Sequence, residues 1–401
     1  MNIKKFIFCF LLITPTANYA YDSEHLSIFK STERCVRCNL TKASFQGQSF
    51  LNVILSKSDL ESSNLKNVKM SFGKFVQARF YSADLSYSTF RGSDFDSADL
   101  QQANLSNSDF SPPKRLQTSS GFSSHGKTAR SSFKAANLKS ANLQNSNFQN
   151  ANFTNANLEG ADFSNSNLLN ADFTGANLTN TKLNSSILEN TNFTQAILKN
   201  VSFKNATYKG TIFDKVILNG SDFSGRKLDN LSFNGAKLEN TNFSNAKLEN
   251  IVFSNAILNN ANFSNSKLVK TRFSKAKLAN ASFEGAKITE AVFLYAFLNK
   301  SNFKNASLKY VTATNASFFN ADFTNASVIS SNLSYADLSM ANLTDANFTK
   351  SILQSANFRN TIFSKTIFKG ASLDNSNFIK SNTKQMLDID VNNIPGAVLT
   401  K

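Results

Sequence analysis

The chain has 401 residues and a formal net charge of +16, with 43 Lys and Arg against 27 Asp and Glu. It contains 39 Phe but no Trp, and only 4 Pro, 3 Cys and 2 His. So few Cys and His leave little material for a metal cluster or for thiol or imidazole catalysis. The residues also offer no Ser/His/Asp set and no phosphate-binding loop. The sequence therefore predicts a protein that is not an enzyme and holds no metal or cofactor.

Residues 1–20, MNIKKFIFCFLLITPTANYA, have the pattern of a secretory signal peptide. Lys4 and Lys5 precede an apolar run over residues 6–13, and Ala20 marks a cleavage site that is imperfect because Asn18 lies at its −3 position. Cys9 lies inside the apolar run rather than at its end, which argues against a lipoprotein. We expect an exported protein, periplasmic or secreted, with no transmembrane segment in the remainder.

Residues 21–34 predict a short capping helix. Asp22 or Ser23 is suited to the N-cap, and Leu26 and Phe29 fall on one helical face. We expect this helix to cover one end of the structure that follows.

A five-residue pattern begins at residue 35 and fills a first block, residues 35–112. Each unit has a small residue, then Asn or Asp, then Phe or Leu, then two variable residues. The Phe or Leu position, here called the centre, recurs from Leu40 to Phe110 with Met70 as the one exception. Apolar residues are thus spaced two and three apart in turn: two keeps both on one strand face, and three requires a corner. Short strands and turns that always curl the same way predict a solenoid.

Two cysteines open this block in the segment ERCVRC. Cys35 falls at a centre and Cys38 at the next small-residue position, so both should point inward across one corner. This separation suits a disulfide. A redox or metal-binding role is the alternative, but the sequence has no second cysteine pair to support it.

An insert of 18 residues, 113–130, interrupts the pattern. It is basic and contains no acidic residue. Loops on a rigid scaffold often carry binding, but an insert can also absorb a shift of register without function. The candidate binding residues of this loop are Lys114, Arg115, Lys127 and Arg130.

The second block, residues 131–380, has a centre every five residues from Phe133 to Phe378. The centres that are neither Phe nor Leu are Tyr208, Ile288, Ala313 and Val328. Over most of this block Phe and Leu centres alternate, so an even number of sides stacks Phe on Phe and Leu on Leu. Residues 381–401 lose the pattern and should cover the far end.

The segments ADLSY, ANLKS, ANFTN and ADFSN resemble the pentapeptide repeat family over most of the chain. The resemblance implies an all-β, right-handed quadrilateral parallel β-helix with four pentapeptides per coil. Each residue then stacks on the one twenty positions later, and the chain forms about sixteen coils. Some family members imitate the shape and negative charge of DNA and act on DNA gyrase in the cytosol. This chain is basic and begins with a signal-like segment, so it is similar to an exported bacterial member, and gyrase is an unlikely partner.

Two surface features and one irregularity follow from the register. The lysines that precede successive centres on one side should stack into a basic strip, a candidate polyanion site unless Asp229 and Glu249 simply neutralise it. A second set of outward positions is apolar, a candidate partner patch unless a local bulge turns the rings inward. Arg226 occupies a small-residue position, where we expect a bulge to free its side chain. The strip residues are Lys227, Lys247, Lys267 and Lys287, and the patch residues are Leu294, Tyr295, Phe297, Phe319 and Tyr335.

These features predict a non-enzymatic scaffold that binds a protein partner or self-associates through its flat faces. The alternative is a polyanion-binding protein, for lipopolysaccharide, a cell-wall polymer or nucleic acid. A factor delivered to a host cell is compatible with export but has no support from individual residues.

Overall fold

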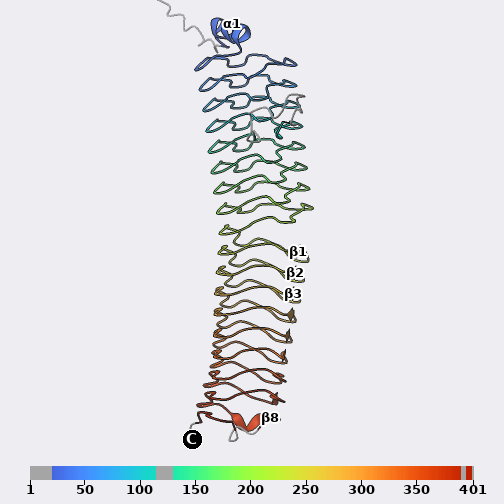
Figure 1. Cartoon of the computed structure of the whole chain (residues 1–401), viewed down its shortest axis with the longest axis vertical. Coiled ribbons are helices and arrows are strands. Elements are labelled where there is room, and N and C mark those ends of the chain that lie inside the picture. The colour runs from blue at the N-terminus through green and yellow to red at the C-terminus, as the bar shows by residue number, and fades with distance from the viewer. Residues whose placement is uncertain (1–19, 114–129, 390–393, 400–401) are drawn as a thin grey trace, which may run out of the picture.

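The computed structural model describes residues 20–113, 130–389 and 394–399, which form a long rod of stacked coils (Figure 1). Helix α1 (Ser23–Thr32) lies at the N-terminal end of the rod, as predicted. The Asp22 carboxylate accepts hydrogen bonds from the backbone N–H groups of Glu24 and His25, at 2.8 and 3.1 Å, and so caps the helix. Phe29 is buried, with its ring 5.3 Å from that of Phe45 and 5.1 Å from that of Phe50. The helix therefore covers the open end of the rod.

Parallel backbone bridges join residues one coil apart and divide the rod into four sides. One ladder runs without a break from Arg34 to Ser372 in sixteen successive pairings, in agreement with the predicted number of coils. We number the sides by their centres in the second block. The first side contains Phe133, the second Leu138, the third Leu143 and the fourth Phe148, and each side repeats every twenty residues. The predicted four-sided parallel β-solenoid is confirmed.

Most rungs are single-residue bridges, but the fourth side also carries three-residue strands. They pair in parallel in chain order and form one six-stranded sheet. Near the C-terminal end β7 and β8 pair in parallel on the same side, and a short 3-10 helix, η1, directly precedes β8. The bounds are β1 (Lys227–Asp229), β2 (Lys247–Glu249), β3 (Lys267–Val269), β4 (Lys287–Thr289), β5 (Ser307–Lys309), β6 (Ser327–Ile329), β7 (Thr366–Ile367), η1 (Thr383–Gln385) and β8 (Met386–Leu387).

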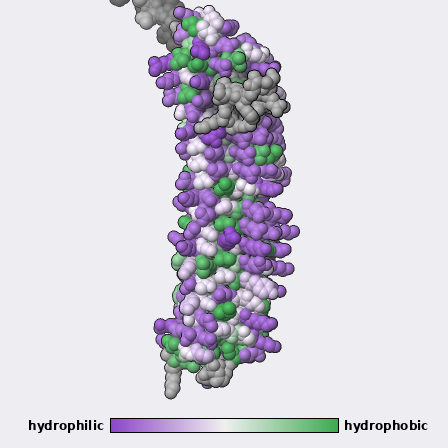
Figure 2. Space-filling view, viewed as in Figure 1, coloured by the Kyte–Doolittle hydropathy of each residue, from purple (hydrophilic) through white to green (hydrophobic). Residues whose placement is uncertain are grey.

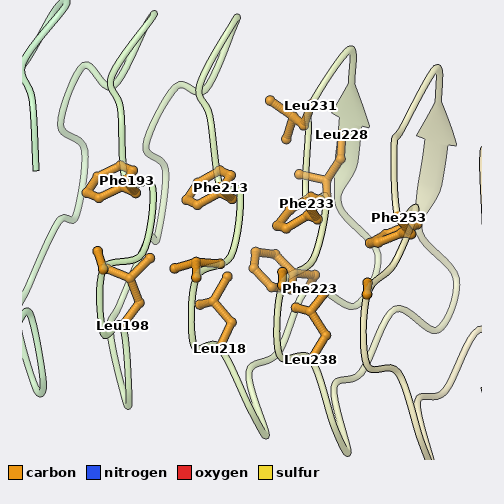
Figure 3. Packing of buried hydrophobic residues seen from close by; sticks show 14 of the residues in the cluster. Phe193, Leu198, Phe213, Leu218, Phe223, Leu228, Leu231, Phe233, Leu238 and Phe253 are labelled. Atoms are coloured by element: carbon orange, nitrogen blue, oxygen red, sulfur yellow. The ribbon is translucent and has the colours of Figure 1, made fainter. Parts of the chain in front are cut away.

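The core consists of stacked centres. On the first side, the rings of Phe133 and Phe153 are 4.9 Å apart and within 9° of parallel, and Phe153 stacks on Phe173 at 4.8 Å. Figure 3 shows the same stack further along the rod, with a row of leucines from the second side beside it. Most centres and the small residues before them are buried, and the partly buried exceptions include Phe50, Val201, Ala206, Tyr208 and Ala371. The alternation of Phe and Leu thus becomes separate aromatic and aliphatic columns.

The polar residues of the repeat stabilise its corners. Asn155, two positions after a centre, has φ of 57°, in the left-handed region that Asn and Gly adopt more readily than other residues. Asn152, just before the same centre, accepts a hydrogen bond from the backbone N–H of Thr154 at 3.1 Å. Amides also join neighbouring coils, as Asn157 Nδ2 donates to Asn137 Oδ1 at 3.2 Å. The Asn-rich surface is therefore largely a requirement of the fold.

The solenoid continues unchanged across the insert. Asp94 pairs with Ser132 and Asp109 with Asn147, so the coils on either side of the insert remain adjacent. At the C-terminal end Met386 and Ile394 are buried, and Val398 bridges to Asn377, so the tail covers that end of the rod.

Candidate interaction surfaces

The two cysteines of the first coil lie at disulfide distance, with Cα atoms 5.6 Å apart and both side chains buried. The Ser58 hydroxyl donates to the carbonyl oxygen of Cys35 at 2.6 Å and accepts from the N–H of Cys38 at 3.0 Å. This pair closes the first corner beneath α1. No group of His, Cys, Asp and Glu in the described part of the chain could hold a metal ion.

The four lysines of the basic strip lie in one column, at the first position of β1, β2, β3 and β4. The register pairs Lys227 with Lys247, Lys247 with Lys267 and Lys267 with Lys287. All four side chains are exposed. Adjacent strands are about 4.8 Å apart, so the strip places like charges on successive rungs.

Acidic neighbours neutralise only the first lysine of the strip. Lys227 Nζ lies 2.9 Å from Asp229 Oδ2, and this hydrogen bond raises the pKa of Lys227. Glu249, the other residue expected to relieve the strip, forms no ion pair with a described lysine within 4.0 Å. The strip therefore keeps three ammonium groups without a close carboxylate among the described residues.

Most of the apolar patch lies across the corner between the first and second sides, and Phe319 lies in the turn at the far end of the second side. Tyr295, Phe297 and Tyr335 are 49, 52 and 62% exposed, whereas Leu294 and Phe319 are half-buried. The backbone stays in register here, since Phe297 bridges to Ser317. The bulge that would have turned these rings inward is absent from this described segment. Figure 2 shows one face of the rod, on which hydrophobic groups are scattered over a mostly hydrophilic surface.

Two rings of this patch occupy positions that disfavour them. Tyr295 and Tyr335 have φ of 55° and 59°, and both lie at corners where the repeat usually places Asn. The left-handed backbone conformation is less favourable for an aromatic residue than for Asn or Gly. Local folding preference therefore does not explain these tyrosines.

The remaining candidates lie partly outside the described residues. Lys114, Arg115 and Lys127 of the insert fall in the undescribed range, whereas Arg130 at its end is exposed. The predicted signal peptide also lies outside the described residues, except for its last residue, Ala20. Within the described ranges, no helix is both apolar enough and long enough to cross a membrane.

The expected bulge at Arg226 is wrong. The strand that follows it pairs with β2 in regular register. The half-buried guanidinium instead enters a gap between two coils, where Nη1 donates to the hydroxyl oxygen of Tyr208 at 3.3 Å. Burial raises the pKa of Tyr208 against the opposing effect of Arg226, so the hydroxyl keeps its proton and donates to the carbonyl oxygen of Phe203 at 3.0 Å. The sequence carried a signal for this site, because both residues depart from the repeat.

Repeated short strands, four ladders and a stacked core define a β-solenoid. Two family models match nearly the whole repeat body. The model for the pentapeptide repeat region matches residues 124–193 and 196–273. The model for pentapeptide repeats (8 copies) matches residues 34–71, 74–111, 256–293, 295–325, 314–349 and 341–379. The chain therefore belongs to the pentapeptide repeat family.

Similar solved structures include other pentapeptide repeat proteins. Full-length QnrB1, a plasmid-mediated fluoroquinolone resistance protein, is 19% identical with a TM-score of 0.28, covering 46% of this chain and 92% of QnrB1. HetL from the cyanobacterium Nostoc sp., involved in heterocyst differentiation regulation, is 20% identical with a TM-score of 0.20, covering 76% of this chain and 97% of HetL. No curated protein sequence matches the chain.

Proposed function

We propose that the protein is an exported, non-enzymatic scaffold that binds a protein partner, or a second copy of itself, through the apolar patch on its rod. The observation that carries this proposal is the exposure of Tyr295, Phe297 and Tyr335 across one corner. Large exposed apolar groups gathered on a hydrophilic surface often mark contact sites, and aromatic rings contribute most to such contacts. Two of these rings also occupy unfavourable backbone positions, which a contact would justify.

The variant Phe297→Ser/Phe319→Ser tests this proposal. It removes two rings of the patch without touching a centre or a left-handed corner residue, so the rod should remain folded. We expect it to lose self-association in analytical ultracentrifugation, or to lose a partner that photocrosslinks to position 297 in the unmodified chain. Ile197→Ser is a matched control, because it removes an exposed apolar side chain from the same side, five coils away. A variant that melts earlier with unchanged association would overturn the proposal.

A second candidate function is binding of a polyanion through the basic strip. Support comes from the register that stacks Lys227 on Lys247, Lys267 and Lys287, with a close carboxylate only at the first. Lipopolysaccharide, a cell-wall polymer and nucleic acid all present repeated negative charges. Binding through the strip must weaken steeply as salt rises, whereas binding through the apolar patch should not.

A further inference from the structure

The rod is opened at one level of the described repeat body, residues 34–378. On the third side Ser202 bridges to the coil before it and Asp222 to the coil after it, but the two do not bridge to each other. On the fourth side Thr207 and Lys227 likewise lack the bridge that their register predicts. The first and second sides stay paired at this level, through Ile212 with Ser232 and Ile197 with Ile217. We call this opened level the joint, formed by residues 201–210 of one coil and 221–231 of the next.

The core shows the same separation. The rings of Phe203 and Phe223, which face each other across the joint, have centroids 6.4 Å apart and tilted by 28°. One coil later, Phe223 and Phe243 stack at 5.3 Å and 8°. Two pockets of about 260 and 300 Å³ occupy the joint, one on the third side and one on the fourth. Tyr208 and Arg226 replace the leucine and the small residue of the repeat, and their bulk holds the coils apart.

Strand β1 therefore has one free edge. In the following coils the first N–H of each strand donates to the coil before it, as Lys247 N does to the carbonyl oxygen of Arg226 at 2.8 Å. The equivalent N–H of Lys227 has no such bond, and Tyr208 N does not donate to the next coil as other centres do. Beside this edge, Asp229 Oδ1 is buried without a hydrogen-bond partner. Buried polar groups are rarely left unpaired. The edge is therefore suited to a partner that accepts a hydrogen bond from the N–H of Lys227 and donates one to Asp229 Oδ1.

The joint also holds a cation that no carboxylate contacts. Arg226 is half-buried, and the one hydrogen bond of its side chain among the described residues goes to a neutral hydroxyl group. Asp222 lines the same pocket, and the charge of Arg226 helps to lower the pKa of Asp222, but the two side chains form no ion pair. Arg226 forms no ion pair within 4.0 Å with a described carboxylate. Lys209, which lines the second pocket, also has none. A guanidinium group offers five donors and forms strong, often bidentate, hydrogen bonds with a carboxylate or a phosphate.

We propose that the joint is a binding site for an extended, acidic segment of another polypeptide. The segment adds as a strand to the free edge of β1, where its backbone satisfies the N–H of Lys227 and donates to Asp229 Oδ1. A Glu or Asp side chain of the segment pairs with Arg226. An anion alone would satisfy Arg226 but not the backbone edge, whereas an extended peptide satisfies both. Strand addition to an existing sheet is an established mode of peptide recognition.

The joint must open further to admit a strand. A strand between two coils requires a separation of about 9.6 Å, twice the usual spacing. The paired first and second sides act as the hinge for this movement. Opening breaks no backbone bridge on the third and fourth sides, because none is present there.

A displayed library of random nine-residue peptides, panned on the full chain, tests this site. We expect enriched peptides that contain Asp or Glu, and a synthetic copy of one should slow hydrogen exchange at Lys227 and Tyr208. Arg226→Gln keeps the bulk of the side chain and should weaken the peptide about tenfold or more. Tyr208→Leu/Arg226→Ala should close the joint and abolish binding. Arg272→Ala, which removes an exposed arginine from the fully paired first side, should bind normally.

Two further variants separate this site from the surfaces proposed above. The first variant changes the strip, Lys247→Gln/Lys267→Gln/Lys287→Gln, and the second changes the patch, Phe297→Ser/Phe319→Ser. Both should still bind the peptide. The proposal is overturned if no peptide is enriched, if the enriched peptides bind equally well to the closed variant, or if the triple lysine variant loses them. The last result would assign the binding to the basic strip.

Discussion

Arg226 and Tyr208 are hydrogen-bonded side chain to side chain, at 3.3 Å, between two coils that share no backbone bridge on that side. In the next coils the position of Arg226 holds Ala246, Ser266 and Ala286, and each of those coils is bridged to its neighbours. One polar contact between bulky side chains has thus replaced a set of backbone hydrogen bonds. In a solenoid, where each coil contacts only its neighbours, such a site weakens the coupling between the two halves.

Restoring the repeat at this site should stabilise the rod. Tyr208→Leu/Arg226→Ala recreates the local pattern and allows the missing backbone bonds to form, each worth about 1 kcal/mol. We expect a higher melting temperature for this double variant in scanning calorimetry. Where the unmodified chain unfolds in two transitions, the double variant should unfold in one. Arg272→Ala serves as the control for charge removal. A double variant that is less stable than the unmodified chain would show that the contact, and not the ladder, holds the coils.

The sequence alone predicted an even number of sides and the stacking of Phe on Phe, because Phe and Leu centres alternate at a strict period of five. The number four, and with it the order of the lysine strip, followed from the resemblance to the pentapeptide repeat family. The sequence also predicted α1, because Asp22 and Phe29 are local signals. It did not predict how the chain would accommodate Arg226. A bulge would cost hydrogen bonds within the coil of Arg226, whereas an opened ladder costs hydrogen bonds to the neighbouring coil. Which of the two costs less depends on that neighbouring coil, where Tyr208 occupies a position that usually holds the smaller leucine.

The basic strip predicts a steep dependence on salt. Changing Lys227, Lys247, Lys267 and Lys287 to Gln should reduce retention on heparin or lipopolysaccharide and flatten its salt dependence, since stacked charges attract a polyanion together. The matched control removes four exposed lysines that do not share one column: Lys199, Lys237, Lys300 and Lys350. Both variants lose the same net charge. Equal losses in the two would show that overall charge, and not the strip, causes retention.

Two carboxylates near the insert should respond to pH in opposite directions. Burial opposes ionisation of Asp109, but hydrogen bonds from Ser111 and Arg91 outweigh it and lower the pKa of Asp109. A lowered pKa contributes stability that is present above the unfolded pKa and lost as pH falls through the folded pKa. Asp109→Asn should therefore destabilise the protein near neutral pH, by on the order of 1 kcal/mol, and much less in acid. Urea unfolding at several pH values measures this difference.

Asp94 provides the opposite case. Burial raises its pKa, and the nearby charge of Asp96 adds to the effect. A raised pKa gives stability that is present at low pH and lost as pH rises through the folded value. Asp94→Asn should thus stabilise the protein near neutral pH, while its side-chain oxygen can still accept from the N–H of Asp96. Changes of the same sign in Asp94→Asn and Asp109→Asn would contradict both assignments.

The tyrosines of the apolar patch should separate stability from association. Tyr295→Asn and Tyr335→Asn replace exposed rings at left-handed corners with the residue that the repeat prefers there, so each should raise stability by up to about 1 kcal/mol. The same changes remove rings from the proposed contact, so association should fall while the melting temperature rises. Tyr310→Asn is the matched control, because Tyr310 is 63% exposed at a left-handed corner (φ 58°) outside the patch. It should gain stability and associate normally. If the patch variants instead melt earlier, the rings stabilise the rod, and their exposure serves no contact.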